Sequence, residues 1–307
     1  MSRHNSVTVR VPASTANLGP GFDCLGLALE VYNTVELSLA VETTVQVTGE
    51  GQGYLPLGRS NLVLQAADRI AEQAGQQVPG WHLRQHNEIP LARGLGSSST
   101  AIVGGLIAAN ELLQAGLDRQ QLLQIATEIE GHPDNVGPAL YGGLTACCVE
   151  LEDVCCIKLD APTQLDIGVV IPRFKIDTRQ AREVLPEQVP FEDAVFNVSR
   201  AACTLAALVA GRWEKLSAVM KDRLHQPARA PLIPGMEEVI SAAEEAGAHG
   251  AALSGSGPTI VAFATEQEDT ILDAMVRAFA NFNVEATGFW TKPNNCGALV
   301  VQEMESL

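Results

Sequence analysis

The stretch PLARGLGSSSTA, Pro90 to Ala101, decides the fold of this chain of 307 residues. Gly94 and Gly96 bracket a leucine, hydroxyl side chains follow from Ser97 to Thr100, and an apolar helical pattern begins at once. The first turn of a helix presents unpaired backbone amides and the positive end of the dipole, and both attract anions. Glycine lets the backbone approach a phosphate, and hydroxyl oxygens suit a hydrated Mg²⁺. The stretch therefore predicts a loop that binds the phosphates of a nucleotide.

This loop differs from the commoner phosphate motifs. The Walker pattern requires Gly-Lys-Ser/Thr, and no lysine occurs between Arg93 and Lys158. The dinucleotide fingerprint requires a third glycine, where this chain has Ser99. An ordinary helix cap is the alternative interpretation, because serine and threonine are preferred capping residues.

The complete string resembles the central phosphate-binding motif of the GHMP kinases (galactokinase, homoserine kinase, mevalonate kinase, phosphomevalonate kinase), which reads Pro-x-x-x-Gly-Leu-Gly-Ser-Ser. The resemblance implies that the loop binds ATP and that Asn61 lies near the adenine. The loop residues concerned are Pro90, Leu91, Ala92, Arg93, Gly94, Leu95, Gly96, Ser97, Ser98, Ser99 and Thr100.

Composition and charge exclude several classes of function. The net charge of −16 argues against a nucleic acid or an acidic membrane as partner, because both require a basic patch. No secretory signal is visible, and the longest apolar stretch noted, 100–113, is too short to span a bilayer. Seven cysteines in such a chain predict reduced thiols and a cytoplasmic location. Cys147-Cys148 and Cys155-Cys156 lack the CxxC spacing of zinc sites, and neighbouring strand residues point to opposite faces, so no four-sulfur site is expected.

Strand and helix patterns mix in an order that favours an α+β protein over a regular βαβ repeat. A composition shift near 160–163 predicts two domains, a nucleotide-binding domain over 1–160 and a C-terminal domain over 161–307. Strands are expected near 7–11, 31–40, 43–49 (the last two as a hairpin), 81–86, 144–150, 154–159, 165–171, 250–257, 258–264, 284–290 and 297–303. Helices are expected over 60–75 with Ser60 as cap, 97–116, 118–130 with an Asp118/Gln121 capping box, 193–210, 213–223, 236–247 and 268–280.

A second informative stretch is PASTANLGPGFDCLGLAL, Pro12 to Leu29. Asn17 and Asp23 flank a Gly19-Pro20-Gly21 turn, and such residues also serve turns that bind nothing. The stretch resembles the N-terminal signature of homoserine kinases. That resemblance implies that Asn17 and Asp23 contact the substrate.

The third stretch is EIEGHPDNVGPALYGG, Glu128 to Gly143. Glu128 and Glu130 lie on different helix faces, so one of them is expected to reach the nucleotide. The resemblance to homoserine kinases favours Glu130 as the Mg²⁺ ligand with Ser98, although a single residue separates this glutamate from the histidine and leaves Glu128 open. Asp134 is either a general base or structural. The expected catalytic residues are Ser98, Glu130, Asp134 and Asn135.

Two further strings, KIDTRQAREVLP and HQPARAPLIPG, contain arginines. Without other information these arginines are expected at the surface, where most arginines lie. Thr178 is expected to cap a short helix that carries Arg179 and Arg182. Both strings resemble homoserine kinase segments whose arginines bind the amino-acid carboxylate, which guanidinium groups bind bidentately. The substrate-binding residues that this resemblance implies are Asn17, Asp23, His132, Asn135, Thr178, Arg182 and Arg229.

LSGSGPT, Leu253 to Thr259, reads alone as a hairpin turn but resembles the third GHMP motif, which closes over the phosphates. The resemblance spans Pro12 to about Pro258. It implies a two-domain fold with an N-terminal domain like ribosomal protein S5 domain 2 and a ferredoxin-like C-terminal domain. It further implies ATP-dependent phosphorylation of the hydroxyl of L-homoserine to O-phospho-L-homoserine in threonine biosynthesis, with Mg²⁺. We also expect a homodimer.

Three other functions remain as alternatives. A different GHMP kinase, such as a mevalonate kinase, is expected to lack the paired Asp23 and arginines, since its substrate has no amino group. A nucleotide-binding regulator is expected to have lost Glu130 or the Ser97-Ser98 pair, and both are present. A serine hydrolase using Ser98, His132 and Asp134 lacks the GxSxG elbow.

Overall fold

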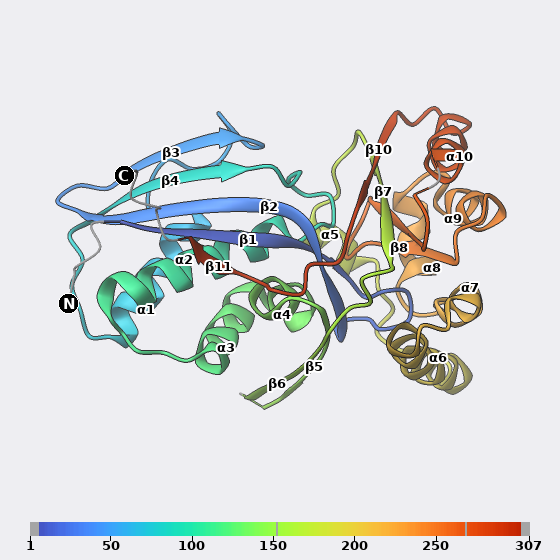
Figure 1. Ribbon diagram of the computed structural model, residues 1–307, viewed down its shortest axis with the longest axis horizontal. Coiled ribbons are helices and arrows are strands. Elements are labelled where there is room, and N and C mark those ends of the chain that lie inside the picture. Colours follow the sequence, from blue (N-terminus) through green and yellow to red (C-terminus); the bar gives the residue numbers. More distant parts are fainter. Residues whose placement is uncertain (1–5, 152, 268, 302–307) are drawn as a thin grey trace.

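The computed structural model describes residues 6–151, 153–267 and 269–301 (Figure 1). A large sheet carries the helices α1–α4 on one face, and a smaller sheet beside it carries α9 and α10 on its outer face. The first residues of the polar N-terminus (1–5) and the last of the strand expected over 297–303 lie outside the described residues. The predicted α+β class is confirmed.

The large sheet has the strand order β11-β1-β2-β4-β3, and β5 pairs with both β2 and β6. The expected hairpin of 31–40 with 43–49 is wrong, because β4 inserts between these strands and pairs in parallel with β3. Trp81 and Leu83 of β4 are fully buried, whereas β3 is mostly exposed, so burial places β4 inside the sheet and β3 at its edge. The strands are β1 Val7–Ala16, β2 Leu25–Ala40, β3 Thr44–Gly49, β4 Gly80–Asn87, β5 Leu144–Glu150, β6 Asp153–Leu159 and β11 Leu299–Val301.

Four helices cover this sheet and bury a core against it. The helix that follows the phosphate loop is buried almost all round, so it forms the centre of the domain. The capping box of Asp118 with Gln121 is confirmed. The cap at Ser60 is wrong, because the side chain of Asn61 accepts the hydrogen bond from the amide of Val63. The helices are α1 Leu62–Gln73, α2 Ser97–Leu113, α3 Arg119–Glu130 and α4 Pro133–Tyr141.

The small sheet has the order β10-β7-β9-β8 with antiparallel neighbours. Its chain order of strand, helices, two strands, helix and strand is that of a ferredoxin-like domain, as expected. The elements are β7 Asp166–Pro172, α5 Thr178–Glu183, α6 Phe191–Ala210, α7 Leu216–Val219, α8 Gln226–Arg229, α9 Met236–Glu245, β8 Gly250–Leu253, β9 Ile260–Ala264, α10 Asp269–Ala280 and β10 Ala286–Thr291, with 3₁₀ turns at Trp213–Lys215 and Ala230–Leu232.

The helix expected over 213–223 is shorter than predicted and ends with α7 at Val219. The carboxylate of Asp222 accepts hydrogen bonds from the backbone amides of Leu224, His225 and Gln226. These bonds hold a tight turn, so the chain cannot continue as a helix through this point.

By length and composition, α6 could cross a membrane, so 100–113 is not the longest apolar stretch of the chain. Two of its buried polar side chains hydrogen-bond within the domain. Asn197 donates to the carboxylate of Asp222, and Thr204 donates to the carbonyl of Val219. These bonds tie α6 into the ferredoxin-like domain.

The two sheets share one hydrophobic cluster, in which Leu18 and Leu27 of the first half pack with Phe263 of the second. The boundary expected after Asp160 stays a prediction. We propose to count residues 293–301 with the large sheet, because β11 pairs with β1 and Pro293 bridges to Leu29.

Two glycine-rich loops meet where the two sheets approach each other. The hydroxyl of Ser254 donates to the carbonyl of Gly94 at 2.6 Å, and the amide of Thr259 donates to the carbonyl of Arg93 at 3.3 Å. A Cβ on Gly94 would lie 2.1 Å from the carbonyl oxygen of Ser254, and the φ of Gly94 is +78°. Only glycine fits this contact.

Gly94→Ala should therefore destabilise the protein much more than Gly53→Ala. Gly53 has nearly the same conformation (φ +80°), but nothing lies within 4 Å of an added Cβ there. Urea unfolding should show a loss of about 1 kcal/mol for Gly53→Ala, from the left-handed backbone alone. Gly94→Ala should lose about 3 kcal/mol or more, because backbone atoms must also move. Equal losses would mean that the contact between the loops does not constrain the fold.

Candidate active site

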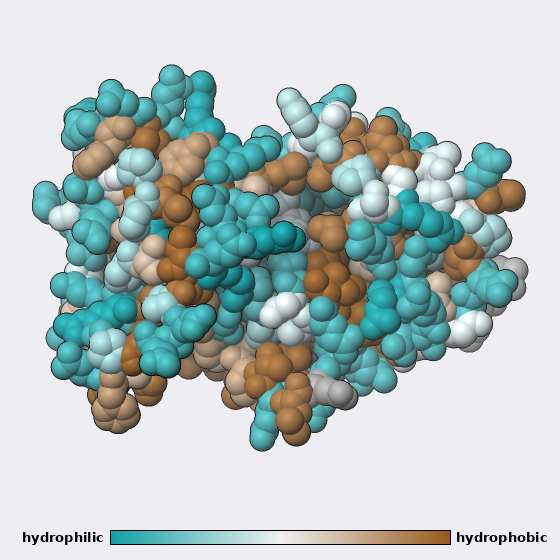
Figure 2. Space-filling model, turned by 180° about the vertical axis from the view of Figure 1, so that it is seen from behind, coloured by the Kyte–Doolittle hydropathy of each residue, from teal (hydrophilic) through white to brown (hydrophobic). Residues whose placement is uncertain are grey.

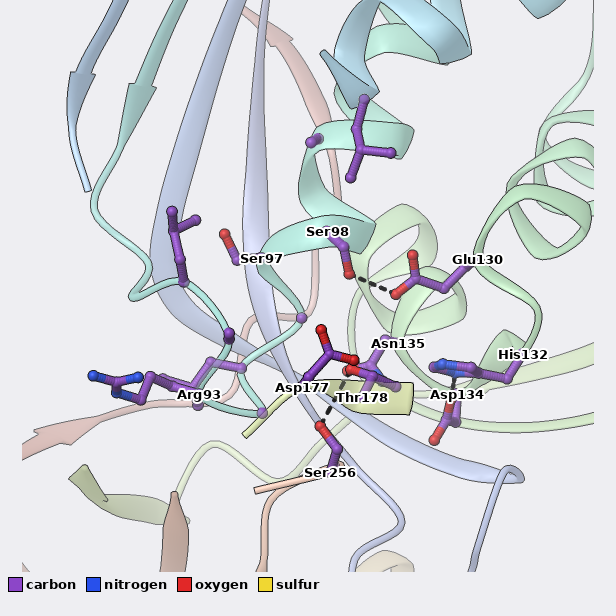
Figure 3. Close-up of a pocket in the computed structure, with 18 of the residues that line it drawn as sticks. Arg93, Ser97, Ser98, Glu130, His132, Asp134, Asn135, Asp177, Thr178 and Ser256 are labelled. Carbon is purple, nitrogen blue, oxygen red and sulfur yellow. Dashed lines mark hydrogen bonds and ion pairs between the residues drawn. The ribbon is translucent and has the colours of Figure 1, made fainter. Parts of the chain in front are cut away.

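A cleft of about 420 Å³ lies between the two glycine-rich loops, the turn after β1, the junction of α3 with α4, and α5 (Figure 3). Segments from both halves of the chain line it. Among the residues singled out from the sequence, the lining includes Asn17, Asp23, Asn61, Leu91, Ala92, Arg93, Gly94, Leu95, Gly96, Ser97, Ser98, Glu130, His132, Asp134, Asn135, Thr178, Arg182 and Arg229. Pro90, Ser99 and Thr100 are not among the lining residues.

The phosphate loop ends in the left-handed residue Gly96 (φ +68°), which caps α2 without a side-chain hydrogen bond. The interpretation of the loop as a Ser/Thr helix cap is therefore wrong. A Cβ on Gly96 would lie 2.1 Å from the hydroxyl oxygen of Ser14, so close packing requires glycine here. The first turn of α2, whose residues Ser97 and Ser98 line the cleft, has the geometry of an anion site.

Arg93 adds an uncompensated donor at the edge of the cleft. Its Nη1 is buried and has no hydrogen-bond partner among the described residues, and Nη2 donates to the carbonyl of Arg173 at 3.3 Å. Burial lowers the pKa of this guanidinium from its ordinary value. Figure 3 shows the side chain extending away from Glu130 and His132. A buried donor without a partner fits an anionic or polar ligand at this end.

Glu130, at the end of α3, accepts hydrogen bonds from Ser98 at 2.7 Å and from Ser99 at 2.9 Å through the same carboxylate oxygen (Figure 3). Glu128 is outside the cleft, where Arg69 binds its carboxylate at 3.0 Å. The helix geometry thus brings Glu130, and not Glu128, to the phosphate loop. A carboxylate beside hydroxyls is a set of hard oxygen donors that suits Mg²⁺.

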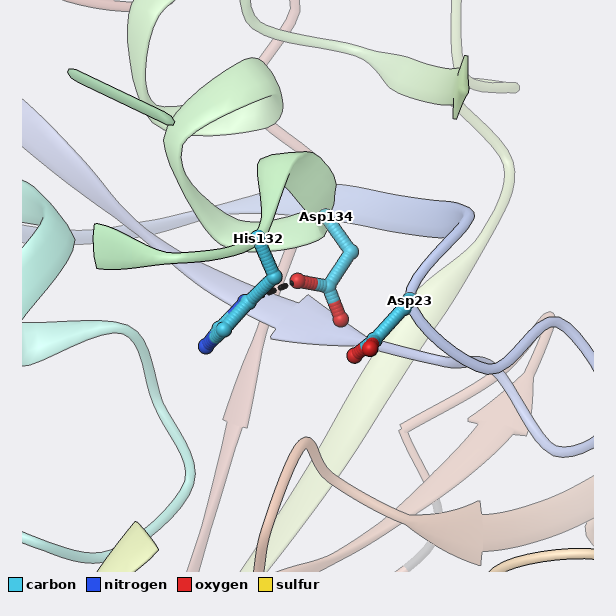
Figure 4. A group of neighbouring side chains, drawn as sticks. All are labelled: Asp23, His132 and Asp134. Atoms are coloured by element: carbon cyan, nitrogen blue, oxygen red, sulfur yellow. Dashed lines mark hydrogen bonds and ion pairs between the residues drawn. The ribbon is translucent and has the colours of Figure 1, made fainter. Parts of the chain in front are cut away.

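His132 and Asp134 form a buried pair at the start of α4. Nδ1 of the histidine lies 2.5 Å from the carboxylate, and Figure 4 shows the other ring nitrogen pointing away from Asp134. Burial by itself lowers the pKa of His132. The hydrogen bond and charge of Asp134, with the charge of Glu130, outweigh burial and raise that pKa above its ordinary value. Asn135 is held beside them by the hydroxyl of Ser14, which donates to its Oδ1 at 2.9 Å.

Asp23 forms a two-point ion pair with Arg182, at 2.8 and 3.0 Å. Asp23 has a left-handed backbone (φ +53°), and its amide donates to the side chain of Asn17 at 3.0 Å. The side chain of Asn17 therefore stabilises the turn, and its Nδ2 donates to the carbonyl of Gly255. The ion pair joins the first half of the chain to α5 across the cleft.

Arg229 is buried, contrary to its interpretation as a surface residue. Its guanidinium donates to the carbonyl oxygens of Ala181 and Gly255 and lies 3.2 Å from Nδ1 of His225. Burial, and then the charge of Arg182, lower the pKa of Arg229 to about 10. Because the hydrogen-bond partners of Arg229 are neutral groups and its side chain lines the cleft, its positive charge is available to an anionic ligand.

The sequence analysis did not identify His225, which holds the guanidinium of Arg229 in place. His225 is fully buried, and burial lowers its pKa. Because Arg229 donates to Nδ1, the neutral ring carries its proton on Nε2, which donates to the carbonyl of Gly19 at 2.7 Å. Phe22 stacks on this ring, with centroids 5.3 Å apart. The spacing Asp222-x-x-His225-x-x-x-Arg229 is the signal that could have identified the group.

The structure corrects the expected cap of α5 and shows how the side chain of Asn61 is held, while the proposed ligand contacts of both residues stay predictions. Thr178 is not the cap of α5, because the side chain of Asp177 accepts the hydrogen bond from the amide of Arg179. Thr178 still lines the cleft, and its hydroxyl lies 3.5 Å from that of Ser256 (Figure 3). Asn61 lines the cleft too, but its side chain caps α1 and donates to Pro56 and Gln85.

Asp23, His132 and Asp134 place one ligand atom each within 4.8 Å of one another (Figure 4). Such a group could hold a cation. In the structure, Arg182 forms an ion pair with Asp23, and His132 is hydrogen-bonded to Asp134. Each carboxylate of the cluster therefore already has a partner inside the protein.

Comparison with known proteins identifies the family of the chain. The family described as GHMP kinases N terminal domain matches residues 61–143, and GHMP kinases C terminal matches residues 204–281. A homoserine kinase of Moorella thermoacetica is 46% identical over 95% of this chain and 99% of that relative. A homoserine kinase of Carboxydothermus hydrogenoformans is 45% identical over 95% and 96%.

Among solved structures, the crystal structure of homoserine kinase from Cytophaga hutchinsonii superposes with a TM-score of 0.87 at 33% identity, covering 98% of this chain and 99% of that one. The predicted two-domain GHMP kinase fold is thereby confirmed. Identity of this extent along nearly the whole chain shows that it belongs to the homoserine kinases, within the GHMP kinase superfamily.

Proposed function

We propose that this chain transfers the terminal phosphate of ATP to the side-chain hydroxyl of L-homoserine, giving O-phospho-L-homoserine and ADP on the route to threonine. One observation carries the proposal. A single cleft holds a phosphate loop on one side and, on the other, a carboxylate and two arginines that match an amino-acid zwitterion. The homoserine kinases that are 45–46% identical to the chain support the choice of acceptor.

The loop from Leu91 to Ser98 is the proposed ATP site. Amides at the first turn of α2 would bind the phosphates, and Arg93 lies at its edge. Glu130 and Ser98 would hold Mg²⁺, which when bound neutralises phosphate charge. Phosphoryl transfer through a loose transition state leaves the protein mainly positioning and charge stabilisation to supply.

The ion pair of Asp23 with Arg182 is the proposed acceptor site in its empty form. A zwitterion carries the same two charges, so its ammonium can replace Arg182 at Asp23 while its carboxylate takes Arg182. The exchange keeps the net charge of the cleft constant, which limits its desolvation cost. Arg229 is the second carboxylate partner, since its internal partners are neutral groups.

His132 and Asn135 are the proposed partners of the acceptor hydroxyl, because both line the cleft beside Glu130. Asp134 already binds His132 and is buried, so we assign it a positioning role rather than that of a general base. Its charge keeps His132 protonated to higher pH. The cytoplasmic location and the homodimer stay predictions.

Glu130→Gln should lose roughly 100-fold or more in kcat, because it removes the carboxylate that meets the phosphate loop. Glu128→Gln is the matched control, two residues away on the same helix and paired with Arg69 at the surface. It should keep kcat within about twofold, as surface pairs contribute little. ADP release with ATP-Mg²⁺ and L-homoserine measures both. A large loss in Glu128→Gln alone would reverse the assignment.

Asp134→Asn should keep a large part of the turnover and lower the pKa of His132. The imidazole titration, followed by NMR, should lie above 6.5 in the native chain and fall in the variant. Because the folded pKa is raised, the pair stabilises the native chain fully below pH 6.5, and this stabilisation is lost as the pH rises through the folded pKa. A loss of ~10³-fold in kcat at unchanged KM would instead make Asp134 a general base.

Arg182→Gln should raise the KM for L-homoserine about 10- to 100-fold and leave the KM for ATP nearly unchanged, since a charged hydrogen-bond partner of the carboxylate is lost. Arg179→Gln, on the same helix, is the control with little effect. Mevalonate and L-serine serve as comparison acceptors. Turnover with mevalonate alone, or an unchanged KM for L-homoserine in Arg182→Gln, would contradict the zwitterion site.

A further inference from the structure

The β5–β6 hairpin projects from the lower edge of the large domain in Figure 1 and carries four of the seven cysteines. Its exposed side chains include Val149, Leu151 and Ile157. Figure 2 shows apolar surface at the same lower edge, seen from behind. The register places Cys147 opposite Cys156 and Cys148 opposite Cys155, so the two pairs lie on opposite faces of the hairpin.

Cys147 and Cys156 are the closer and more buried pair. Their sulfur atoms lie 2.7 Å apart, Cys147 is buried and Cys156 is half-buried. The amide of Cys147 donates to the carbonyl of Cys24 and not to Cys156. The pair is therefore of the non-hydrogen-bonded type, in which side chains on antiparallel strands approach most closely. This proximity allows a disulfide without rearrangement of the strands.

The two thiols are not equivalent. The thiol of Cys147 donates to the sulfur of Cys156, and this bond lowers the pKa of Cys156 and raises that of Cys147. Cys156 is also the more exposed of the two thiols, since it is half-buried and Cys147 is buried, so an oxidant in solvent reaches Cys156 first. Thiolate is the form that reacts with oxidants. Cys147 is then in place as the resolving thiol.

We propose that Cys147 and Cys156 form a peroxide-sensitive dithiol site, which closes into a disulfide within the hairpin. The thiolate of Cys156 attacks hydrogen peroxide, breaks its O–O bond and becomes a sulfenic acid, with hydroxide leaving. The sulfur of Cys147 then attacks the sulfenic sulfur, its proton passes to the departing oxygen, and water leaves. In total, two thiols are oxidised and one peroxide is reduced to two waters.

The Cys147–Cys156 pair packs against α4, the helix whose first residues line the candidate active site. A Cβ on Gly137 of α4 would lie 3.0 Å from the sulfur of Cys147 and 3.3 Å from that of Cys156. Asp134 and Asn135 lie three and two residues before Gly137 on the same helix. The inference itself concerns the thiols and does not depend on the proposed kinase reaction.

The test treats the reduced full-length chain with hydrogen peroxide, blocks remaining thiols with iodoacetamide and analyses tryptic peptides by mass spectrometry. Residues 120–158 form one tryptic peptide with all four hairpin cysteines, because no lysine or arginine lies between Arg119 and Lys158. The native chain should give this peptide two hydrogen atoms lighter with two thiols protected from alkylation. Reduction with dithiothreitol should restore both thiols.

Cys155→Ser is the matched control, because it changes the neighbouring residue on the opposite face and should still form the disulfide. Cys156→Ser and Cys147→Ser should both lose it, and using both guards against one variant failing to fold. Formation of the disulfide in these two variants but not in Cys155→Ser would assign it to Cys148 and Cys155 and overturn the proposal. Absence of any disulfide in the native chain would overturn it as well.

Discussion

The backbone contact between the two glycine-rich loops is the constraint on which the rest of the structure depends. The hydroxyl of Ser254, 160 positions later in the chain, donates to the carbonyl of Gly94 at 2.6 Å. The backbone carbonyl oxygen of Ser254 comes so close that Gly94 has no room for a side chain. The amide of Gly255 also donates to the carbonyl of Ala16, so the β1 strand joins the same contact. Because these loops belong to different sheets, their contact sets the width of the cleft. Glycine serves here for close approach as much as for flexibility.

Some charges in the cleft are paired within the protein, and others are held only by neutral groups. Asp23 binds Arg182, and His132 binds Asp134. Arg229 is held by carbonyl groups and a neutral histidine, and burial lowers its pKa to about 10. A buried cation without a counter-charge is costly. The buried guanidinium of Arg229 in the cleft lining therefore fits the anionic ligand of the proposed function.

Contiguous features of the sequence were predicted well. The glycine-rich turn before a buried helix and the capping box at Asp118 depend on neighbours in the chain, and the structure has both. The ferredoxin-like order of elements was expected from the resemblance to the GHMP kinases, and the structure has it too. The hairpin expected before β4 was wrong, because sheet order follows the burial of Trp81 and Leu83, which alternation within one strand does not reveal. Thr178 and Ser60 were wrong as caps, because an aspartate or asparagine one position away makes the capping hydrogen bond.

The sequence by itself determined a local feature, a glycine-rich turn before a buried helix, whose first-turn amides suit an anion. It also determined the chemical types of the acceptor residues. Only the tertiary structure decided which of them meet. Asp23 and Arg182 are 159 positions apart, and Glu130 rather than Glu128 reaches Ser98 because the two carboxylates leave α3 on different faces. The burial of Arg229 and its support by His225 likewise arise from packing between segments, which depends on the folded arrangement of the whole chain.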